Sequence, residues 1–590
     1  MKYWLYVLTI AVLLVFFIPV IANGQLWPNH GVAYDGAGLN DGVVRVIIKG
    51  DTTVVTGNVT TDITTGGDDW QKIVMQYIDS TGIILQGQFP PVESSDEYNA
   101  RASDMVLLPD GRFAVAGYIS YIGVDYSDGL MIIFNSDLTV DSWVTYQGTA
   151  LYNIGLDYLA YDSFNDCLYG GGTIADTGVA QIGAVLVKYS LELQPLWSDW
   201  PRVNGTGING FDCPTGLVVD TITGNVFLSA LLVNVSHHFV GTVVGFDSDG
   251  NQLWIQEILW LYSFGLLLDP QGRLNIFGGL YSENYSIMSG ACFQYSTAGD
   301  SLDGFIYEQG GYEYFVCGTF DDSGNRYLGG TATPVGGLTA NRLNTVTTDV
   351  NGYSGRLNPQ QLQFYRKSAH EPGFEVITLN NALTRGMLVK HNPAGQFLGE
   401  ALWGDTLNNQ IYQIKVDYAN RPVTVIIEYD SYNRKNYFVT FDPSLEPADS
   451  AVIGYPRLLV VSDFNFFNSP QLVTDGDHKM VFGGTKQNLG QGLDFAVISL
   501  IPYMFGDANG DGLRIGADVV RLVNYFKGQL EYGLWLLIAG DCNGDCATMG
   551  ADVTFLVAYF RGLNDGPPNG SFPYGNCIDF EDWFADQIGP

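Results

Sequence analysis

Basic residues are scarce in this chain: 27 lysines and arginines stand against 62 aspartates and glutamates, which gives a formal net charge of −35. Over most of the molecule such a surface repels a phosphate backbone or an anionic lipid headgroup. Nucleic acids are therefore excluded as partners, whereas divalent cations and neutral ligands remain compatible with the charge.

Cysteine is rare as well, with seven in 590 residues. An odd number leaves at least one cysteine unpaired or intermolecular in an oxidising compartment. Four of them, Cys167, Cys213, Cys292 and Cys317, are expected to be packed strand residues or occasional staples. The other three, Cys542, Cys546 and Cys577, lie close to the C-terminal end.

Recognisable catalytic motifs are missing. The chain has no nucleophile elbow, no metalloprotease helix motif and no glycine-rich phosphate loop in a suitable setting. The six histidines form no cluster with metal-ligand spacing. Acidic residues are numerous enough for a glycosidase carboxylate pair, but spacing in the sequence does not place two of them together. The catalytic residues, if any, are unknown at this stage.

The N-terminus has the features of an export signal. Lys2 supplies the positive charge, residues 4–20 are almost entirely apolar, and Ala22 and Gly24 offer small residues for cleavage. We predict a signal peptide over 1–24 and a secreted protein that is not inserted in the membrane after cleavage, whether free or associated with a cell surface. The alternative is an uncleaved anchor, because the apolar run approaches the length that spans a bilayer.

A repeat runs through the middle of the chain. The composition of 46% hydrophobic and 15% charged residues, with 72 glycines, is typical of a turn-rich β protein. Each copy contains short β-rich runs separated by turn residues, as in 105–108, 113–117 and 130–134, followed by Trp143. Equivalent turn glycines recur about 50 residues apart, at Gly224 among others. Four-stranded antiparallel meanders are the predicted unit.

Period and strand count together predict an all-β fold, a β-propeller of about seven to eight four-stranded blades over 25–502. The turns, each followed by a strand that ends in Gly-Gly or Ala-Gly, resemble a bacterial β-propeller repeat family often found in exported proteins. We expect Leu26 and Trp27 to supply the outer strand of the last blade and so close the ring. An insertion is predicted at about 332–385, either as a solvated excursion or as a ligand-contacting loop.

The chemistry is concentrated in two C-terminal loops. Calcium needs six to eight hard oxygen ligands, which a loop supplies from side chains at positions 1, 3, 5 and 12 and from the carbonyl at position 7. Two segments have this pattern, each followed by an amphipathic segment, 519–526 and 553–560. The candidate ligands are Asp507, Asn509, Asp511, the carbonyl of Leu513 and Asp518 in the first loop, and Asp541, Asn543, Asp545, the carbonyl of Ala547 and Asp552 in the second.

The two loops are not equivalent. Gly512 at position 6 of the first loop permits a sharp turn, whereas Cys546 takes that position in the second. A side-chain-bearing residue in that conformation costs on the order of 1 kcal/mol, so the second site is expected to bind Ca²⁺ more weakly. Cys577 could bridge to Cys542 or to Cys546 and restrain this loop.

The duplicated loop-plus-helix, aspartate at position 12 and the lack of an entering helix resemble a dockerin over 503–570, followed by a tail over 571–590. The resemblance implies a small α-helical domain that folds with two Ca²⁺ ions and docks onto a cohesin-like protein. Positions 10 and 11 of the loops, which often contact the cohesin in that family, are here Gly516-Ala517 and Gly550-Ala551, small residues that leave the specificity open.

Two functional hypotheses follow. The first is a secreted, non-catalytic binding or scaffold protein, whose propeller is presented to partners or glycans and attached through the dockerin-like end. The second is a polysaccharide-degrading glycosidase or lyase with its active site on the funnel face of the propeller, because the resemblance links dockerins to assemblies that digest plant-type glycans.

Overall fold

The computed structural model describes the strands and most of their turns within 25–333 and 385–503, a short strand at 343–345, and residues 516–527, 549–561 and 563. The predicted signal peptide, most of the insertion and the tail lie outside the described residues. The chain divides into two compact units. Most of the strands belong to the larger unit, and the helices α2 (Gly516–Phe526) and α4 (Gly550–Phe560) belong to the smaller one.

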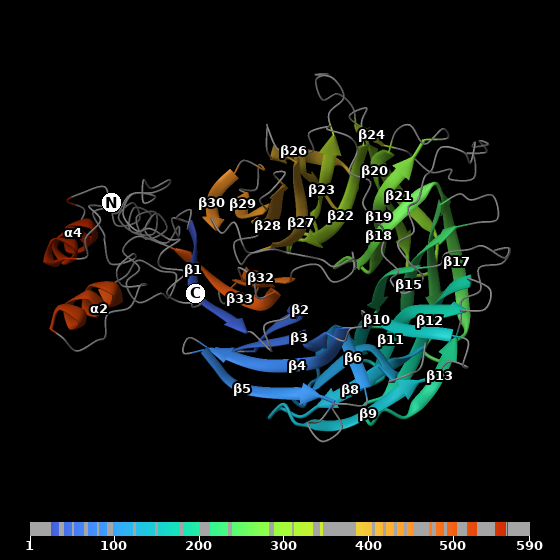
Figure 1. Ribbon diagram of the computed structural model, residues 1–590. Coiled ribbons are helices and arrows are strands. Elements are labelled where there is room, and N and C mark those ends of the chain that lie inside the picture. Colours follow the sequence, from blue (N-terminus) through green and yellow to red (C-terminus); the bar gives the residue numbers. More distant parts are fainter. Residues whose placement is uncertain are drawn as a thin grey trace, which may run out of the picture. The chain divides into compact units, whose positions relative to one another are not determined.

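The larger unit consists of antiparallel meanders that follow one another along the chain (Figure 1). The first four are β2 (Asp41–Lys49), β3 (Thr52–Ile63), β4 (Asp69–Asp79) and β5 (Gly82–Phe89); β6 (Tyr98–Leu107), β7 (Phe113–Tyr121), β8 (Ser127–Phe134) and β9 (Val140–Tyr146); β10 (Tyr152–Asp162), β11 (Cys167–Asp176), β12 (Gln181–Ser190) and β13 (Pro195–Asp199); and β14 (Cys213–Val219), β15 (Val226–Val233), β16 (Phe239–Phe246) and β17 (Gln252–Leu259).

The remaining strands are β18 (Leu261–Leu268), β19 (Arg273–Tyr281), β20 (Met288–Ser296) and β21 (Ser301–Tyr307); β22 (Tyr312–Phe320), β23 (Arg326–Thr333), β25 (Arg385–His391) and β26 (Phe397–Trp403); β27 (Asn408–Val416), β28 (Pro422–Tyr429), β29 (Arg434–Phe441) and β30 (Pro447–Ile453); and β31 (Gln471–Thr474), β32 (Met480–Asn488) and β33 (Gly492–Tyr503) with β1 (Gln25–Tyr34). A single parallel pair, Met288 with Tyr312, joins the meanders β18–β21 and β22–β26 into one sheet.

The first strands of the meanders form a closed ring. Each contacts the first strand of the next meander, and β31 contacts β2. Val43 and Val46 of β2 share an apolar cluster with Val481 of β32, and Gly483 lies against both valines of β2. Because the last meander packs on the first, the ring has no open end, and the fold is propeller-like and all-β.

The last meander takes its outer strand from the start of the chain. The order of this sheet is β1-β33-β32-β31, with β1 at the edge. Leu26 and Trp27 belong to β1, so the strand that contains them occupies the position predicted from the sequence. This pairing ties the two ends of the repeat region together.

Burial changes across each meander in the way the ring requires. Every residue of the third strand β16 is buried, because neighbouring meanders cover both of its faces. The outer strand β17 consists mainly of exposed and partly exposed residues instead. Between the meanders the side chains interdigitate, as Val54 and Ile73 do with Val115 and Ile132.

Tryptophans near the start of two outer strands reach the next meander. Trp197 donates its indole N–H to the carbonyl of Ser248 at 3.0 Å, and Trp254 donates to that of Thr297 at 2.9 Å. The turn glycines that meet these rings, Gly250 and Gly299, have φ of 88° and 89°, and a Cβ on either one would lie under 3 Å from the indole. The turn glycine therefore serves both the hairpin and the contact between meanders.

The insertion between β23 and β25 contributes β24 (Leu343–Thr345), which pairs with the outer strand β21. The insertion thus adds a strand to a sheet, beyond the surface loop expected from the sequence. No helix among the described residues is long and apolar enough to cross a membrane.

Candidate functional site

The first strands carry a β-bulge at equivalent positions. Register shifts in their pairing with the second strands leave one extra residue in each of β2, β6, β10, β14, β18, β22 and β27. The extra residues are Val44, Ser103, Asp157, Thr215, Phe264, Val316 and Tyr412. A bulge changes the direction in which the side chains around it point. Residues next to these bulges therefore point in directions that a regular strand would not give them.

Glycines of the second strand make room for these bulges. A Cβ on Gly117, Gly172, Gly278 or Gly330 would lie 1.9 to 2.0 Å from a carbonyl oxygen of the neighbouring first strand. Each of these glycines belongs to an Ala-Gly or Gly-Gly pair of the repeat. The small residues recognised in the sequence therefore have a steric cause, the close approach of the bulged backbone.

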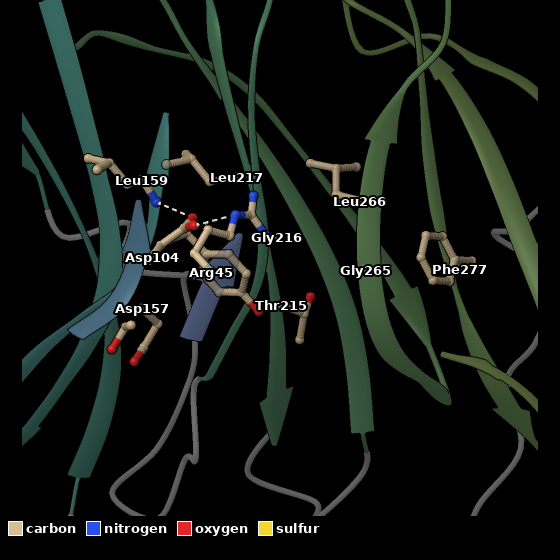
Figure 2. A pocket seen from close by; sticks show the side chains of 12 residues that line it. Arg45, Asp104, Asp157, Leu159, Thr215, Gly216, Leu217, Gly265, Leu266 and Phe277 are labelled. Atoms are coloured by element: carbon tan, nitrogen blue, oxygen red, sulfur yellow. Dashed lines mark hydrogen bonds and ion pairs between the residues drawn. The ribbon is translucent and has the colours of Figure 1, made fainter. Parts of the chain in front are cut away.

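A pocket of about 220 Å³ opens among the bulged strands. We call it the inner-strand pocket (Figure 2). Its lining comes from β2, β6, β10, β14, β18 and β19 and comprises Arg45, Ser103, Asp104, Asp157, Tyr158, Leu159, Thr215, Gly216, Leu217, Gly265, Leu266 and Phe277. The titratable side chains of the lining come from β2, β6 and β10. The side chain of Phe277, from β19, lies at the opposite end of the lining (Figure 2).

Arg45 and Asp104 form an ion pair inside the pocket. The guanidinium Nε lies 3.0 Å from Asp104 Oδ1, and the Asp104 side chain is only 10% exposed. The same carboxylate accepts the backbone N–H of Met105 at 2.8 Å and, from the next meander, that of Leu159 at 2.9 Å. Burial raises the pKa of Asp104, and Arg45 and the two N–H groups oppose that rise. Asp104 thus holds three meanders in a fixed arrangement.

Asp157 is the second carboxyl of the pocket, and it is the extra residue of its bulge. It lies deep in the protein yet retains partial exposure. Thr173 donates its hydroxyl to Asp157 Oδ2 at 2.9 Å, while Oδ1 makes no hydrogen bond with any residue that the structure describes. Burial raises its pKa to about 6, against a smaller lowering by Thr173. Near neutral pH this group can therefore both accept and release a proton.

One more cation lies near the pocket. Lys415 of β27 is an exposed residue, although many protein atoms lie around its side chain. Burial lowers its pKa, and the positive charge of Arg45 lowers it further. The pocket is lined by the cation Arg45 and by the carboxyls of Asp104 and Asp157, and Lys415 is a second cation close to Arg45.

The predicted calcium ligands are only partly within the described residues. Two of them, Asp518 and Asp552, are described, and both are 0% exposed although they lie at the start of surface helices. Asp552 Oδ2 accepts the N–H of Met549 at 2.6 Å, an N-terminal cap of α4. Leu522 and Leu556 are fully buried in the apolar cluster that α2 and α4 share.

The other eight predicted ligands lie outside the described residues: Asp507, Asn509, Asp511, Leu513, Asp541, Asn543, Asp545 and Ala547. The same holds for Cys542, Cys546 and Cys577. Where the structure describes the chain, no three His, Cys, Asp or Glu side chains gather closely enough to hold a metal ion.

The helices themselves begin earlier than predicted. They end at Phe526 and Phe560, as the sequence indicates, but start at Gly516 and Gly550, three residues before the predicted segments 519–526 and 553–560. Position 12 of each predicted loop consequently lies in the first turn of a helix, where the helix dipole favours a carboxylate. Cys167, Cys292 and Cys317 are free thiols in strands, so the staple alternative is wrong for these three, and Cys213 lies in β14.

Sequence reasoning did not find the inner-strand pocket. Arg45, Asp104 and Asp157 come from three different meanders, and none belongs to a recognisable motif. The sequence carries one indirect signal. The pair of small residues in the second strand of a meander marks the bulge in the first strand with which it pairs.

Comparison with known proteins yields only distant likenesses. No protein-family model and no curated protein matches the chain. Among solved structures, the polysaccharide lyase Uly1 is 9% identical with a TM-score of 0.35, covering 82% of this chain and 98% of its own. Drosophila Plexin A in complex with Semaphorin 1b is 9% identical with a TM-score of 0.34, covering 81% and 88%. A protein of unknown function from Dyadobacter fermentans is 9% identical with a TM-score of 0.31, covering 58% and 93%.

Proposed function

We propose that the chain is an exported β-propeller of eight blades that attaches to a cohesin-like partner through a calcium-dependent, dockerin-like module. In this proposal residues 1–24 are a cleaved signal, 25–502 the propeller and 503–570 the module, and the mature protein acts outside the cell or on its surface. Each four-stranded meander, including the two joined by Met288 and Tyr312, corresponds to one blade.

The burial of Asp518 and Asp552 carries the attachment part of the proposal. Both carboxylates are buried, and they occupy the same position in two helices of similar sequence. A buried carboxylate is favourable only where hydrogen bonds or a cation stabilise its charge. Hydrogen bonds such as the one from Met549 to Asp552 already contribute, and a Ca²⁺ ion held by the preceding loop would lie next to this position and stabilise the carboxylate further. The hard oxygen ligands of both predicted loops fit such an ion.

Calcium titration of the intact mature protein by calorimetry tests this proposal. We expect two binding events, the second weaker, with Asp518→Asn weakening the first and Asp552→Asn the second. Asp249→Asn, a change of an exposed turn carboxylate in the larger unit, should leave both events unchanged. The absence of binding heat in the wild-type protein would contradict the attachment module.

Polysaccharide cleavage in the propeller is the second candidate, and Asp157 is the observation that favours it. A carboxyl group with a pKa of about 6 that lines a pocket is suited to general acid–base chemistry. Screening the secreted protein against a polysaccharide panel for new reducing ends, or for the unsaturated ends that a lyase leaves, tests it. Activity that is present in the wild type and lost in Asp157→Asn would replace the non-catalytic proposal with this one.

A further inference from the structure

A second set of β-bulges lies in the outer strands of the meanders. Register shifts leave one extra residue near the start of each of β5, β9, β13, β17, β21 and β26. The extra residues are Ile84, Asp141, Leu196, Leu253, Leu302 and Leu398. The five aliphatic ones are 43 to 53% exposed. Five meanders therefore present an apolar side chain to solvent at an equivalent position.

Protection of the sheet edges does not account for these aliphatic residues. Bulges and charged side chains on an edge strand prevent it from pairing with a strand of another molecule. Asp141 fits that role, because its carboxylate is exposed and forms an ion pair with Arg112. An exposed leucine at the same place adds apolar contact area instead of charge, and apolar area favours association.

Two further exposed apolar residues lie at the same end of the meanders. Phe164, in the turn between β10 and β11, is 60% exposed, and Ile222, in the turn between β14 and β15, is 79% exposed. In an antiparallel meander the first turn and the start of the fourth strand are at one end. Leu196 and Leu253, from the outer strands β13 and β17 (Figure 1), therefore lie on the same face of the ring as these two turns.

The third and fourth meanders meet at these turns. A Cβ on Gly224, in the turn between β14 and β15, would lie 3.0 Å from Phe164 Cδ1. Trp197 of β13 lies against Gly250, in the turn that leads into β17. Because neighbouring strands are about 5 Å apart, the first turn and the outer strand of one meander are roughly 10 to 15 Å apart. We call the four exposed apolar residues of these two meanders the turn-side patch: Phe164, Leu196, Ile222 and Leu253.

The charges around the turn-side patch are negative. The four turns of these two meanders on this face contain the exposed residues Asp166, Glu192 and Asp249 and no lysine or arginine. Lys188 is buried and donates to the carbonyl of Ser248 in one of these turns, so it is not available to a partner. An anionic lipid surface or a second copy of this chain would bring like charges together. A segment that carries lysine or arginine beside apolar residues matches both the charge and the apolar side chains.

We propose that the turn-side patch docks a cationic, amphipathic protein segment, whose apolar residues contact the patch and whose lysines or arginines face the surrounding carboxylates. The surface belongs to the propeller and needs neither the calcium module nor a cleavage reaction. Loss of calcium binding or absence of hydrolysis would therefore leave this inference standing, and its failure would leave the attachment proposal standing.

Fluorescence anisotropy of labelled synthetic peptides with the intact mature protein tests the inference. The first probe is an amphipathic peptide of leucine and lysine, the second has serine in place of leucine, and the third has glutamate in place of lysine. We expect the leucine–lysine peptide to bind most tightly and the serine–lysine peptide more weakly, because it lacks apolar contact area. The leucine–glutamate peptide should not bind, because its charge has the same sign as the carboxylates around the patch.

Two double variants remove apolar area from the patch without changing its charge. Phe164→Ser combined with Ile222→Ser should weaken binding of the leucine–lysine peptide about tenfold, and Leu196→Ser combined with Leu253→Ser should weaken it likewise. Leu259→Ser is the matched control, because Leu259 is 41% exposed but lies at the other end of β17, and it should bind as the wild type does.

Several results would overturn the inference. These are no binding of the leucine–lysine peptide, equal binding of either of the other peptides, wild-type binding by a double variant whose circular dichroism is unchanged, and an equal loss of binding in Leu259→Ser. Sedimentation equilibrium gives a further test, in which we expect the wild type to be a monomer. A wild-type dimer that either double variant dissociates would assign the patch to a second copy of the chain and so overturn the proposal as well.

Discussion

Replacing Asp157 by asparagine should stabilise the propeller at alkaline pH. Asparagine has nearly the same shape, and its carbonyl oxygen can still accept the hydroxyl of Thr173. What it removes is an ionised carboxylate held in a site that disfavours charge, where burial raises the pKa from 3.8 to about 6. The substitution therefore isolates the electrostatic effect of burial.

The size and sign of the effect follow from that pKa. Roughly two pH units separate the folded and unfolded values, and each unit corresponds to about 1.4 kcal/mol. Because Asp157 is partly exposed, screening reduces the total to about 2 kcal/mol. The folded protein keeps a proton that the unfolded chain has lost between about pH 4 and pH 6. Wild-type stability thus falls as pH rises through this window, and the advantage of Asp157→Asn grows to its full size above it.

Urea denaturation of the wild type and Asp157→Asn at pH 8 and at pH 4 measures this difference, with Asp249→Asn as an exposed control. The variant should be more stable at pH 8 and nearly equal to the wild type at pH 4, while the control shows no such change. An equal gain at both pH values, or no gain at pH 8, would refute the reasoning about Asp157.

Two further predictions concern packing in the larger unit. Gly172→Ala should destabilise the propeller by about 3 kcal/mol or more, because the added methyl group would meet a backbone carbonyl at 1.9 Å. Gly183→Ala is the control, since its methyl group would meet only a side chain at 3.4 Å and should change stability little. Thermal unfolding of the two variants measures the difference. Trp254→Phe should cost about 1 kcal/mol or more, since the hydrogen bond to Thr297 of the next meander is lost; an unchanged urea midpoint would show that this contact is dispensable.

The hairpins could be predicted from sequence because their cause is local. Gly224, Gly272 and Gly324 have φ of 73°, 73° and 77°, in the left-handed region that only glycine adopts at little energetic cost, and such residues mark turns in any sequence. Closure by β1 was predictable for a similar reason, since the last meander lacked a run that the N-terminus possessed.

The inner-strand pocket could not be predicted, because its cause is not local. Arg45, Asp104 and Asp157 each lie in a different meander, and they meet only when the ring of first strands closes. The bulges that aim these residues depend on the register between two strands, which alternation of side chains does not reveal. Likewise, the helix starts at Gly516 and Gly550 depend on a buried aspartate in the first turn, and helix propensity places no start at glycine.

Hydrogen–deuterium exchange of the intact mature protein, with calcium and with a chelator, tests the attachment proposal most directly. We expect calcium to slow exchange strongly in α2 and α4, the helices that begin with the buried Asp518 and Asp552, and to leave the strands of the propeller unchanged. Equal protection of α2 and α4 with and without calcium would contradict a calcium-dependent module.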